Sequence, residues 1–307
     1  MAEAFAKKSI DAVHRRRFLA TATAAAGGAL LPATAWPATP SKAPTAALPQ
    51  AFDLRNDNGK NYITSVKDQD QPNACNACTA FAVVATVEGT FNKKNQQMGS
   101  QGPDFDEMAL FLAPVSGPGD VASGGCGTSH WWPKYALARC QSTGLQWQGS
   151  PTKPPQHIET FKSLLSEDPN QNPINNLKQT QDAIKTWLTS NGPVAAVMVQ
   201  YEDLFAWGKA WADQHPGSAN PNVYSPGKMA SPGPHRPPLP IVGGHVVSIV
   251  GYNDTGQKYW ICKNSWGPAW NGDGYVLIEQ GSASGPGPVG IGSCYIDLID
   301  VWGVTIS

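Results

Sequence analysis

The sequence predicts an α+β fold with two lobes, in which helices dominate the first half of the chain and strands the second. Residues 80–91 lack proline, contain one glycine at Gly89 and are apolar nearly all round, which predicts a buried helix. Residues 176–190 are apolar on one face and are followed by Asn191-Gly192-Pro193, which predicts an amphipathic helix that ends there. Short β-rich segments bounded by Gly, Asn or Asp then predict strands at 194–199, 246–252, 258–263 and 274–279.

Loops are predicted between these elements. Residues 101–130 are rich in Gly, Pro and Ser, and residues 146–176 are rich in Pro, Gln and Asn. A short helix is expected at 133–139. Residues 213–240 are dense in Pro, Gly, Ser and Asn, which predicts a long surface insertion within the stranded half.

The first 35 residues predict an export signal. Five basic residues precede a mildly apolar, alanine-rich stretch at 18–31, and Ala33-Thr34-Ala35 is a small-x-small cleavage site. The stretch is too short and too weakly apolar for a membrane anchor. Arg15-Arg16-Arg17 before Phe18-Leu19 is typical of a twin-arginine signal, with the ordinary secretory route as the alternative. We therefore expect a bacterial protein that is exported to the periplasm or secreted, with a flexible linker at 36–47.

Charge excludes some partners of the mature chain. Removing residues 1–35 takes five basic and two acidic residues from the 22 and 23 of the whole chain, which leaves 17 and 21 and a net charge of −4. No basic patch favours nucleic acid, and no second apolar span favours a membrane. The remaining length suffices for one large domain or two lobes with a core.

All six cysteines follow the export signal, so disulfides are expected. Cys78 is distinctive because it stands at the start of the predicted helix, where the helix dipole and free N–H groups favour a thiolate. If Cys78 stays free, five cysteines remain, so at least one more is free or pairs outside the chain.

A nucleophilic thiolate needs a base and a group that orients the base. His245 at a predicted strand and Asn264 after the next strand are the candidates. Gln69 can donate an N–H group to an oxyanion beside the backbone N–H of Cys78. Taken singly, His245 would be interpreted as a core histidine, Asn264 as a turn residue and Gln69 as a surface amide. Together with Cys78 they predict acyl transfer by a paired cysteine and histidine.

Four motifs carry a family resemblance: Ser65-Val66-Lys67-Asp68-Gln69, the segment from Cys75 to Phe81, the segment from His245 to Tyr252, and Asn-Ser-Trp-Gly-x-x-Trp from Asn264. In this order they resemble the motifs of papain-like cysteine peptidases of the C1 family. The resemblance implies a papain-like two-lobe fold, with a helical lobe at about 58–174, a β-barrel-like lobe at about 175–307 and a cleft between them, in a peptidase domain spanning 48–307.

The resemblance also implies the chemistry. Cys78 is the expected nucleophile, His245 the acid and base, and Asn264 the residue that orients the imidazole, while Gln69 and the N–H of Cys78 bind the oxyanion. The substrate is a peptide or protein, the intermediate is a thioester, and no metal or organic cofactor is implied. Glu88 is expected to be a buried, hydrogen-bonded acid beneath the site.

For the disulfides, the resemblance implies a Cys75–Cys126 bridge. A second bridge is expected between Cys262 and Cys294. Cys140 would then have no disulfide partner.

The chain departs from the family pattern at several positions. Thr79 stands where the family usually has Trp, and Gly244 where it has Asp or Asn. The interval from Gln69 to Cys78 is longer than usual, so Gln71 is a rival oxyanion donor. Residues 127–131 replace the Gly-Gly that binds the substrate backbone in the family. No long segment precedes the match, so an N-terminal inhibitory domain is not expected.

Two other functions fit parts of the sequence. Cys75 and Cys78 form a Cys-x-x-Cys pair, which is compatible with a periplasmic thiol oxidoreductase. The departures from the family pattern are compatible with a degenerate papain-fold protein that binds peptides without cleaving them. A zinc site is disfavoured because the sequence has no second Cys-x-x-Cys or spaced histidine pair.

Overall fold

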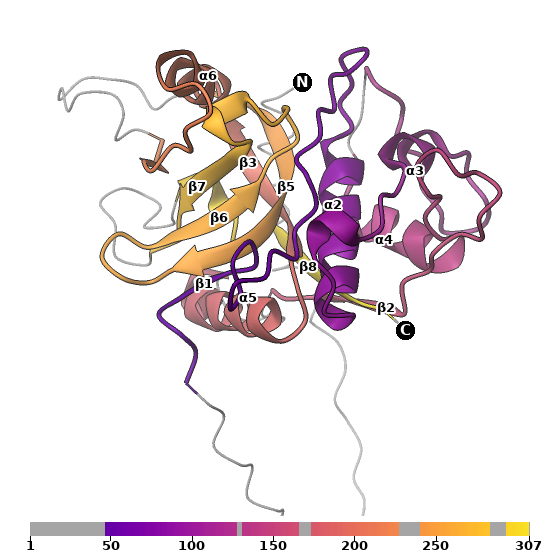
Figure 1. The fold of residues 1–307 in the computed structure, drawn as a ribbon, viewed down its shortest axis with the longest axis horizontal. Coiled ribbons are helices and arrows are strands. Elements are labelled where there is room, and N and C mark those ends of the chain that lie inside the picture. The colour runs from indigo at the N-terminus through magenta and orange to yellow at the C-terminus, as the bar shows by residue number, and fades with distance from the viewer. Residues whose placement is uncertain (1–46, 128–130, 166–172, 227–239, 283–292, 307) are drawn as a thin grey trace, which may run out of the picture.

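The computed structural model describes residues 47–127, 131–165, 173–226, 240–282 and 293–306. The expected export signal and all but the last residue of the expected linker lie outside these ranges. Figure 1 shows helix α2 (Cys78–Lys94) between a large sheet on one side and the helices α3 (Glu107–Leu112) and α4 (Pro133–Ser142) on the other. The predicted α+β layout, helical part first, is confirmed.

Helix α2 is buried along most of its length, and every residue from Thr79 to Thr90 is buried. Its small and apolar residues allow this close packing on two sides. The N-cap residue Ala77 provides no side-chain hydrogen bond, so the N–H groups of the first turn remain available beside Cys78. The helix predicted at 80–91 is confirmed and extends further at both ends.

The other two helices of this part have local reasons to begin where they do. Helix α4 begins at Pro133, at a position where a proline costs no backbone hydrogen bond. Helix α3 begins after Asp106, whose carboxylate accepts from the N–H of Ala109 at 2.8 Å. Because α3 has only six residues, it gives no periodicity in the loop-rich stretch around it, and the sequence pattern does not predict it. A short 3-10 helix, Gly99–Gln101, precedes α3.

The sheet has eight strands among the described residues, ordered β2-β8-β3-β5-β6-β7-β4, with β1 paired to β5. The pairs are antiparallel except for β4 on β7. The strands are β1 (Ala51–Asp53), β2 (Thr160–Ser163), β3 (Val194–Tyr201), β4 (Val223–Tyr224), β5 (Ile241–Asn253), β6 (Tyr259–Lys263), β7 (Tyr275–Glu279) and β8 (Asp300–Thr305).

This sheet is open rather than closed into a barrel. Its end strands β2 and β4 do not pair with each other in the described part of the chain. Strand β4 has only two residues, which offer too few backbone groups to continue the ladder round to β2. The expected barrel-like lobe is therefore a curved but unclosed sheet.

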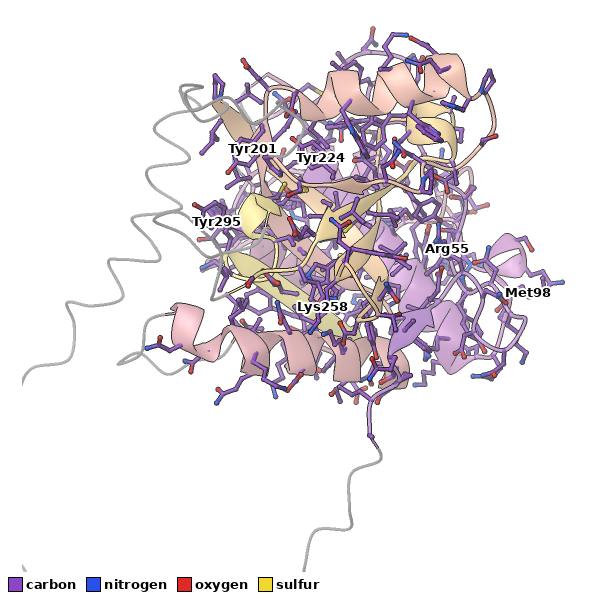
Figure 2. All side chains as sticks on the ribbon, turned by 90° about the vertical axis from the view of Figure 1, so that its left-hand side faces the viewer. Arg55, Met98, Tyr201, Tyr224, Lys258 and Tyr295 are labelled. Carbon is purple, nitrogen blue, oxygen red and sulfur yellow. A yellow bond between two sulfur atoms is a disulfide. The ribbon has the colours of Figure 1, made fainter. Side chains whose placement is uncertain are left out.

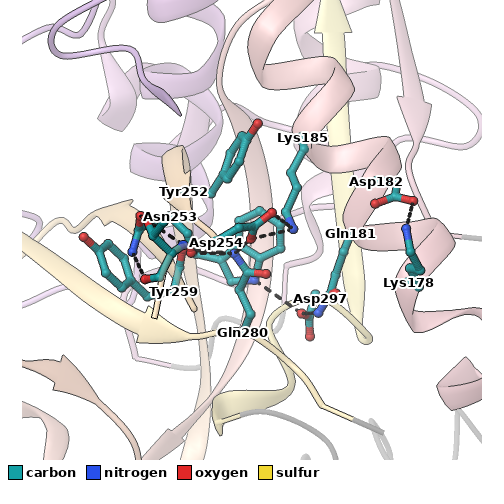
Figure 3. Close-up of polar contacts among 12 residues, drawn as sticks. Lys178, Gln181, Asp182, Lys185, Tyr252, Asn253, Asp254, Tyr259, Gln280 and Asp297 are labelled. Carbon is teal, nitrogen blue, oxygen red and sulfur yellow. Dashed lines mark hydrogen bonds and ion pairs between the residues drawn. The ribbon is translucent and has the colours of Figure 1, made fainter. Parts of the chain in front are cut away.

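Helices α5 (Leu177–Ser190) and α6 (Leu204–Gln214) lie at opposite ends of the sheet (Figures 1 and 2). Helix α5 is attached by Lys185, whose Nζ lies 2.8 Å from both carboxylate oxygens of Asp254, and by Gln181, which donates to Asp297 at 2.8 Å (Figure 3). At the other end, the hydroxyl of Tyr224 donates to Asp203, the N-cap residue of α6, at 2.5 Å.

The predicted amphipathic helix and the four predicted strands are confirmed as α5, β3, β5, β6 and β7. The sequence pattern does not predict β1, β2, β4, β8 or α6. Strands β1, β2 and β4 have only two to four residues, which is too few for a local signal. Within the expected insertion at 213–240, the described residues include the end of α6 and strand β4, and residues 227–239 lie outside the description.

Candidate active site

Cys78 is the first residue of α2, where the helix meets strand β5. Its thiol is half-buried and forms no disulfide. The side chain packs against the small apolar cluster of Ala82, Val197 and Val246, which joins the helix to the sheet. The backbone N–H of Val246 hydrogen-bonds to the thiol and favours its ionised form. The sulfur therefore lies beside the residue that follows His245 in the chain.

The disulfide pattern bears on the chemistry of Cys78. Cys75 is bonded to Cys126, as the family resemblance implies, and the N–H of Asn76 donates to the carbonyl of Cys126 at 3.1 Å. Cys75 is thus not available as a redox partner for Cys78.

The expected second bridge between Cys262 and Cys294 is wrong in this structure. Both residues are fully buried free thiols in the core of the sheet, where each is packed by neighbouring apolar side chains. Cys140 is also a buried free thiol, as expected.

His245 lies in β5 with only 3% of its surface exposed, and Asn264 follows β6 with 4% exposed. The two side chains meet with His245 Nε2 2.7 Å from Asn264 Oδ1. Because an amide oxygen only accepts, Nε2 carries the proton and Nδ1 is the ring nitrogen with a free lone pair. This tautomer is the one that a general base needs.

Trp266 covers the imidazole. Its ring stacks on His245 with centroids 4.6 Å apart and an angle of 24° between the planes. Trp270 packs edge-on against Trp266 at 4.9 Å and 90°. The two indoles therefore hold the imidazole plane and exclude water from the bond between His245 and Asn264.

Burial and hydrogen bonds have opposite effects on the two titratable groups. Burial lowers the pKa of His245 to about 4, while the bond to Asn264 raises it. Burial raises the pKa of the Cys78 thiol, while the N–H groups of Val246 and of the first turn of α2 lower it. Each shift favours the neutral group, so a thiolate and an imidazolium can coexist here only by stabilising each other.

Gln69 is buried next to this pair, but its side chain is engaged. Its Nε2 donates to the carbonyl of Cys75 at 2.9 Å, and its Oε1 accepts from the hydroxyl of Ser265 at 2.7 Å. A second N–H of the amide remains for a ligand. Gln71, the rival donor, is exposed to solvent.

Thr79 replaces the usual tryptophan in a specific way. It is buried, and its hydroxyl donates to the carbonyl of Trp131 at 2.6 Å. Threonine thus ties the start of α2 to the segment in which the sequence departs from the family's Gly-Gly. Residues 128–130 of that segment lie outside the description.

A cluster of buried charges lies beneath the site. Glu88 is 1% exposed and accepts from the hydroxyl of Thr64 at 2.6 Å and from the N–H of Phe105 at 2.9 Å, which confirms it as a buried, hydrogen-bonded acid. The same Thr64 hydroxyl accepts from Lys263 of β6 at 2.9 Å. Lys67 lies 2.7 Å from Glu107 and 3.9 Å from Glu88.

This cluster borders a small hollow of about 10 Å³, which is lined also by Asn264 and Ser265. The Nδ2 atom of Asn264 has no hydrogen-bond partner among the described residues. The described residues contain no group of His, Cys, Asp and Glu side chains that could hold a metal ion.

Phe205 is a neighbour of the site that sequence reasoning missed. It is the second residue of α6, and its ring centroid lies 5.5 Å from that of Trp266. No local signal identifies Phe205, because the sequence does not predict α6. A phenylalanine outside a predicted element is usually interpreted as a residue of the hydrophobic core.

Comparisons with known proteins identify the family of this chain. A sequence model described as "Papain family cysteine protease" matches residues 48–297. Fruit bromelain from Ananas comosus is 27% identical over 252 residues, which make up 80% of this chain and 59% of that protein. Papain from Carica papaya is 25% identical over 247 residues, again 80% and 59% of the two chains. The chain therefore spans about 59% of the length of these relatives.

Solved structures show the same fold. The bromelain protease from Ananas comosus, in complex with the E64 inhibitor, has a TM-score of 0.53 at 24% identity and covers 85% of this chain and 100% of its own. Procathepsin B S9 from Trypanosoma congolense has a TM-score of 0.58 at 20% identity, with 89% and 82% covered. The expected papain-like fold is confirmed.

Proposed function

Because this chain belongs to the papain family of cysteine proteases, we propose that it hydrolyses peptide bonds through Cys78, His245 and Asn264. The observation that carries the proposal is the 2.7 Å bond from His245 Nε2 to Asn264 Oδ1, shielded by Trp266 and adjacent to a thiol at a helix N-terminus. These groups supply a nucleophile, a base and a group that orients the base. The substrates are peptides or proteins.

The first chemical step is attack by the Cys78 sulfur on the peptide carbonyl. His245 takes the thiol proton at Nδ1, while its other proton stays on Nε2 and donates to Asn264 Oδ1. The helix dipole and the N–H of Val246 favour the developing thiolate. The carbonyl oxygen becomes an oxyanion, for which the backbone N–H of Cys78 and the second amide hydrogen of Gln69 are the donors.

The intermediate then collapses to a thioester. His245 gives its proton to the leaving amine, the C–N bond breaks, and the amine departs. Water next attacks the thioester carbonyl, with His245 accepting a proton, and the Cys78 sulfur leaves as the carboxylic acid forms. Protons balance within the pair, and no cofactor takes part in these steps.

We also propose that the protein acts outside the cytoplasm, after removal of residues 1–35. The Cys75–Cys126 disulfide supports an oxidising compartment. Among the described residues, no helix is long and apolar enough to cross a bilayer.

The proposal is tested by intact mass of the purified mature protein after treatment with E64 without reductant, at mildly acidic pH. We expect one adduct, on Cys78, because Cys140, Cys262 and Cys294 are buried. His245→Ala should slow labelling by about 100-fold or more, the usual contribution of a general base.

Labelled protein should also lose its activity against an unfolded protein substrate. No adduct on a free Cys78, or equal labelling of His245→Ala, would contradict the proposed site. A binding protein that keeps the fold without hydrolysis would give the first of these results.

A further inference from the structure

We propose that the hydroxyl of Thr79 is a donor with two acceptors: it donates to the carbonyl of Trp131 while Cys78 is a thiol, and it turns to the Cys78 sulfur when the thiolate forms. This inference rests on the proposed function, because it concerns the nucleophile of the same site. Thr79 stands where papain-like peptidases usually have tryptophan, so this donor is a feature of this chain and not of the family pattern.

The carbonyl that holds the Thr79 hydroxyl is fixed beside the nucleophile. Thr79 follows Cys78 directly in the first turn of α2, is 2% exposed, and donates to Trp131 at 2.6 Å. Trp131 is 4% exposed, and its indole N–H donates to the carbonyl of Val121 at 2.8 Å, which holds the residue in place. The next residue, Trp132, packs against the same apolar cluster as Cys78. The peptide group that accepts from Thr79 therefore belongs to the site.

Thr79 uses its hydroxyl differently from Thr86 on the same helix. The Thr86 hydroxyl lies 2.8 Å from the carbonyl of Ala82, four residues earlier, and 2.9 Å from the hydroxyl of Ser248, which is a common arrangement for a threonine inside a helix. Thr79 is the second residue of α2, so the residue four positions earlier is not part of the helix. Its hydroxyl has one proton to donate and depends on acceptors outside the helical ladder.

The Cys78 sulfur is the second acceptor within reach of this hydroxyl. Burial raises the pKa of the Cys78 thiol, whereas the N–H of Val246 and both the N–H and the hydroxyl of Thr79 lower it. A hydroxyl lowers the pKa of a thiol by donating to the charged sulfur. Because a hydrogen bond to a charged acceptor is roughly twice as strong as one to a neutral acceptor, the thiolate competes successfully with the Trp131 carbonyl for this proton.

The other side chains around the sulfur offer no charge to stabilise a thiolate. His245, which precedes Val246 on β5, is the titratable group that the site provides. Among the described residues, the cluster against which Cys78 packs is apolar and consists of Ala82 from α2, Val197 from β3 and Val246 from β5, with Trp132 and Ile299 packed against it. No side chain of this cluster can therefore replace the Thr79 hydroxyl as a donor.

The change of acceptor belongs to the first step of the proposed reaction. The thiol proton moves to Nδ1 of His245, and the Thr79 hydroxyl keeps its own proton. The sulfur thus gains a donor before it attacks the substrate carbonyl. When the carbon–sulfur bond forms, the negative charge leaves the sulfur and the hydroxyl returns to Trp131.

The test measures the rate at which iodoacetamide alkylates Cys78 from pH 3 to pH 9, with the modified residue verified by peptide mass. Iodoacetamide is neutral, so its rate follows the fraction of thiolate. Thr79→Val keeps the size of the side chain and removes the hydroxyl. It should raise the pH of half-maximal rate by about one pH unit, which is about tenfold in rate below that pH, and leave the alkaline plateau nearly unchanged. Thr79→Ser keeps the hydroxyl and should retain the wild-type profile.

Thr86→Val is the matched control, because it also removes a buried hydroxyl from α2 but lies about two turns further along the helix. It should leave the pH of half-maximal rate unchanged, and the Tm of each variant measures its separate cost in stability. If Thr79→Val does not fold, Thr79→Ala provides the same comparison. An unchanged pH profile without the Thr79 hydroxyl, or an equal shift in Thr86→Val, overturns the inference.

E64 labelling of Cys78 separates this inference from the proposed function. Labelling of wild type and Thr79→Val together with an unchanged pH profile overturns only the role of Thr79. Absence of labelling in the wild type overturns both.

Discussion

Glu88→Ala is expected to lower the free energy of unfolding by about 3–5 kcal/mol, because it removes one partner from a buried charge cluster. Glu88 on α2 accepts two hydrogen bonds, from Thr64 at 2.6 Å and Phe105 at 2.9 Å, and faces Lys67 at 3.9 Å. Alanine would leave both donors buried without this acceptor. It would also leave the charges of Lys67 and Lys263 without the carboxylate that now lowers the cost of their burial.

The magnitude follows from these contacts. Each buried donor left unsatisfied costs about 1–3 kcal/mol, and the loss of one member of a buried ion pair costs about 3–5 kcal/mol in total. These costs overlap, because the same carboxylate makes every contact, so they are not added. Glu88→Gln keeps one carbonyl oxygen as an acceptor and should cost less, about 1–3 kcal/mol.

Thermal unfolding followed by tryptophan fluorescence measures the effect. For a domain of this size, 1 kcal/mol shifts Tm by about 2–4 °C, so Glu88→Ala should lower Tm by roughly 6–20 °C. The control is Asp182→Ala, which removes an acid from the exposed pair with Lys178 in Figure 3 and should change stability by less than about 1 kcal/mol. A Tm for Glu88→Ala no lower than that of Asp182→Ala would refute the reasoning.

Three further predictions concern the proposed site, the buried acid Glu107 and the packing of α6. Asn264→Ala removes the acceptor at 2.7 Å from His245 and should slow E64 labelling about 10- to 150-fold, the equivalent of one charged hydrogen bond; a rate within a factor of two of wild type would be inconsistent with an orienting role. Burial raises the pKa of Glu107 to about 7 from 4.5, so its contribution to stability is fully present below pH 4.5 and is lost as the pH rises through 7. Glu107→Gln should remove up to about 3 kcal/mol of this pH dependence. The Tm of the wild type minus the Tm of Glu107→Gln is measured at pH 4.5 and at pH 8, and an equal difference at the two pH values would argue against the prediction. Gly208→Ala places a methyl group 2.3 Å from the Trp270 ring and should cost about 1–3 kcal/mol, whereas Ala210→Gly on the exposed side of α6 should cost no more than about 1 kcal/mol; equal Tm values for the two variants would contradict the packing argument.

The sequence predicts the long elements well, because their signals are local. The apolar run that became α2, the amphipathic pattern of α5 and the β-rich segments of β3, β5, β6 and β7 are all visible within one window of residues. Helix α3 and strands β2 and β4 are two to six residues long, and α6 lies in a segment without a clear period. Such elements exist because of partners elsewhere in the chain, as β2 does through its pairing with β8.

The candidate site shows the same division. Cys78, His245, Asn264 and Gln69 can be identified from motifs, since each motif pairs a reactive side chain with the local backbone that carries it. The pairing of Cys75 with Cys126 follows from resemblance and is present, whereas the expected bond between Cys262 and Cys294 is absent. A disulfide requires two sulfur atoms in contact, and spacing in a sequence does not specify that contact.

The sequence by itself therefore determined the α+β fold class and the motifs of the papain family, and it indicated the residues that we propose as thiol, imidazole and orienting amide. Only the tertiary structure decided that Gln69 is held by Cys75 and Ser265, that the sheet stays open, and that Phe205 extends the ring surface beside His245. The physical reason is that a motif identifies the residue types that are present. The distances between residues far apart in the chain are set only when helices and strands pack against one another.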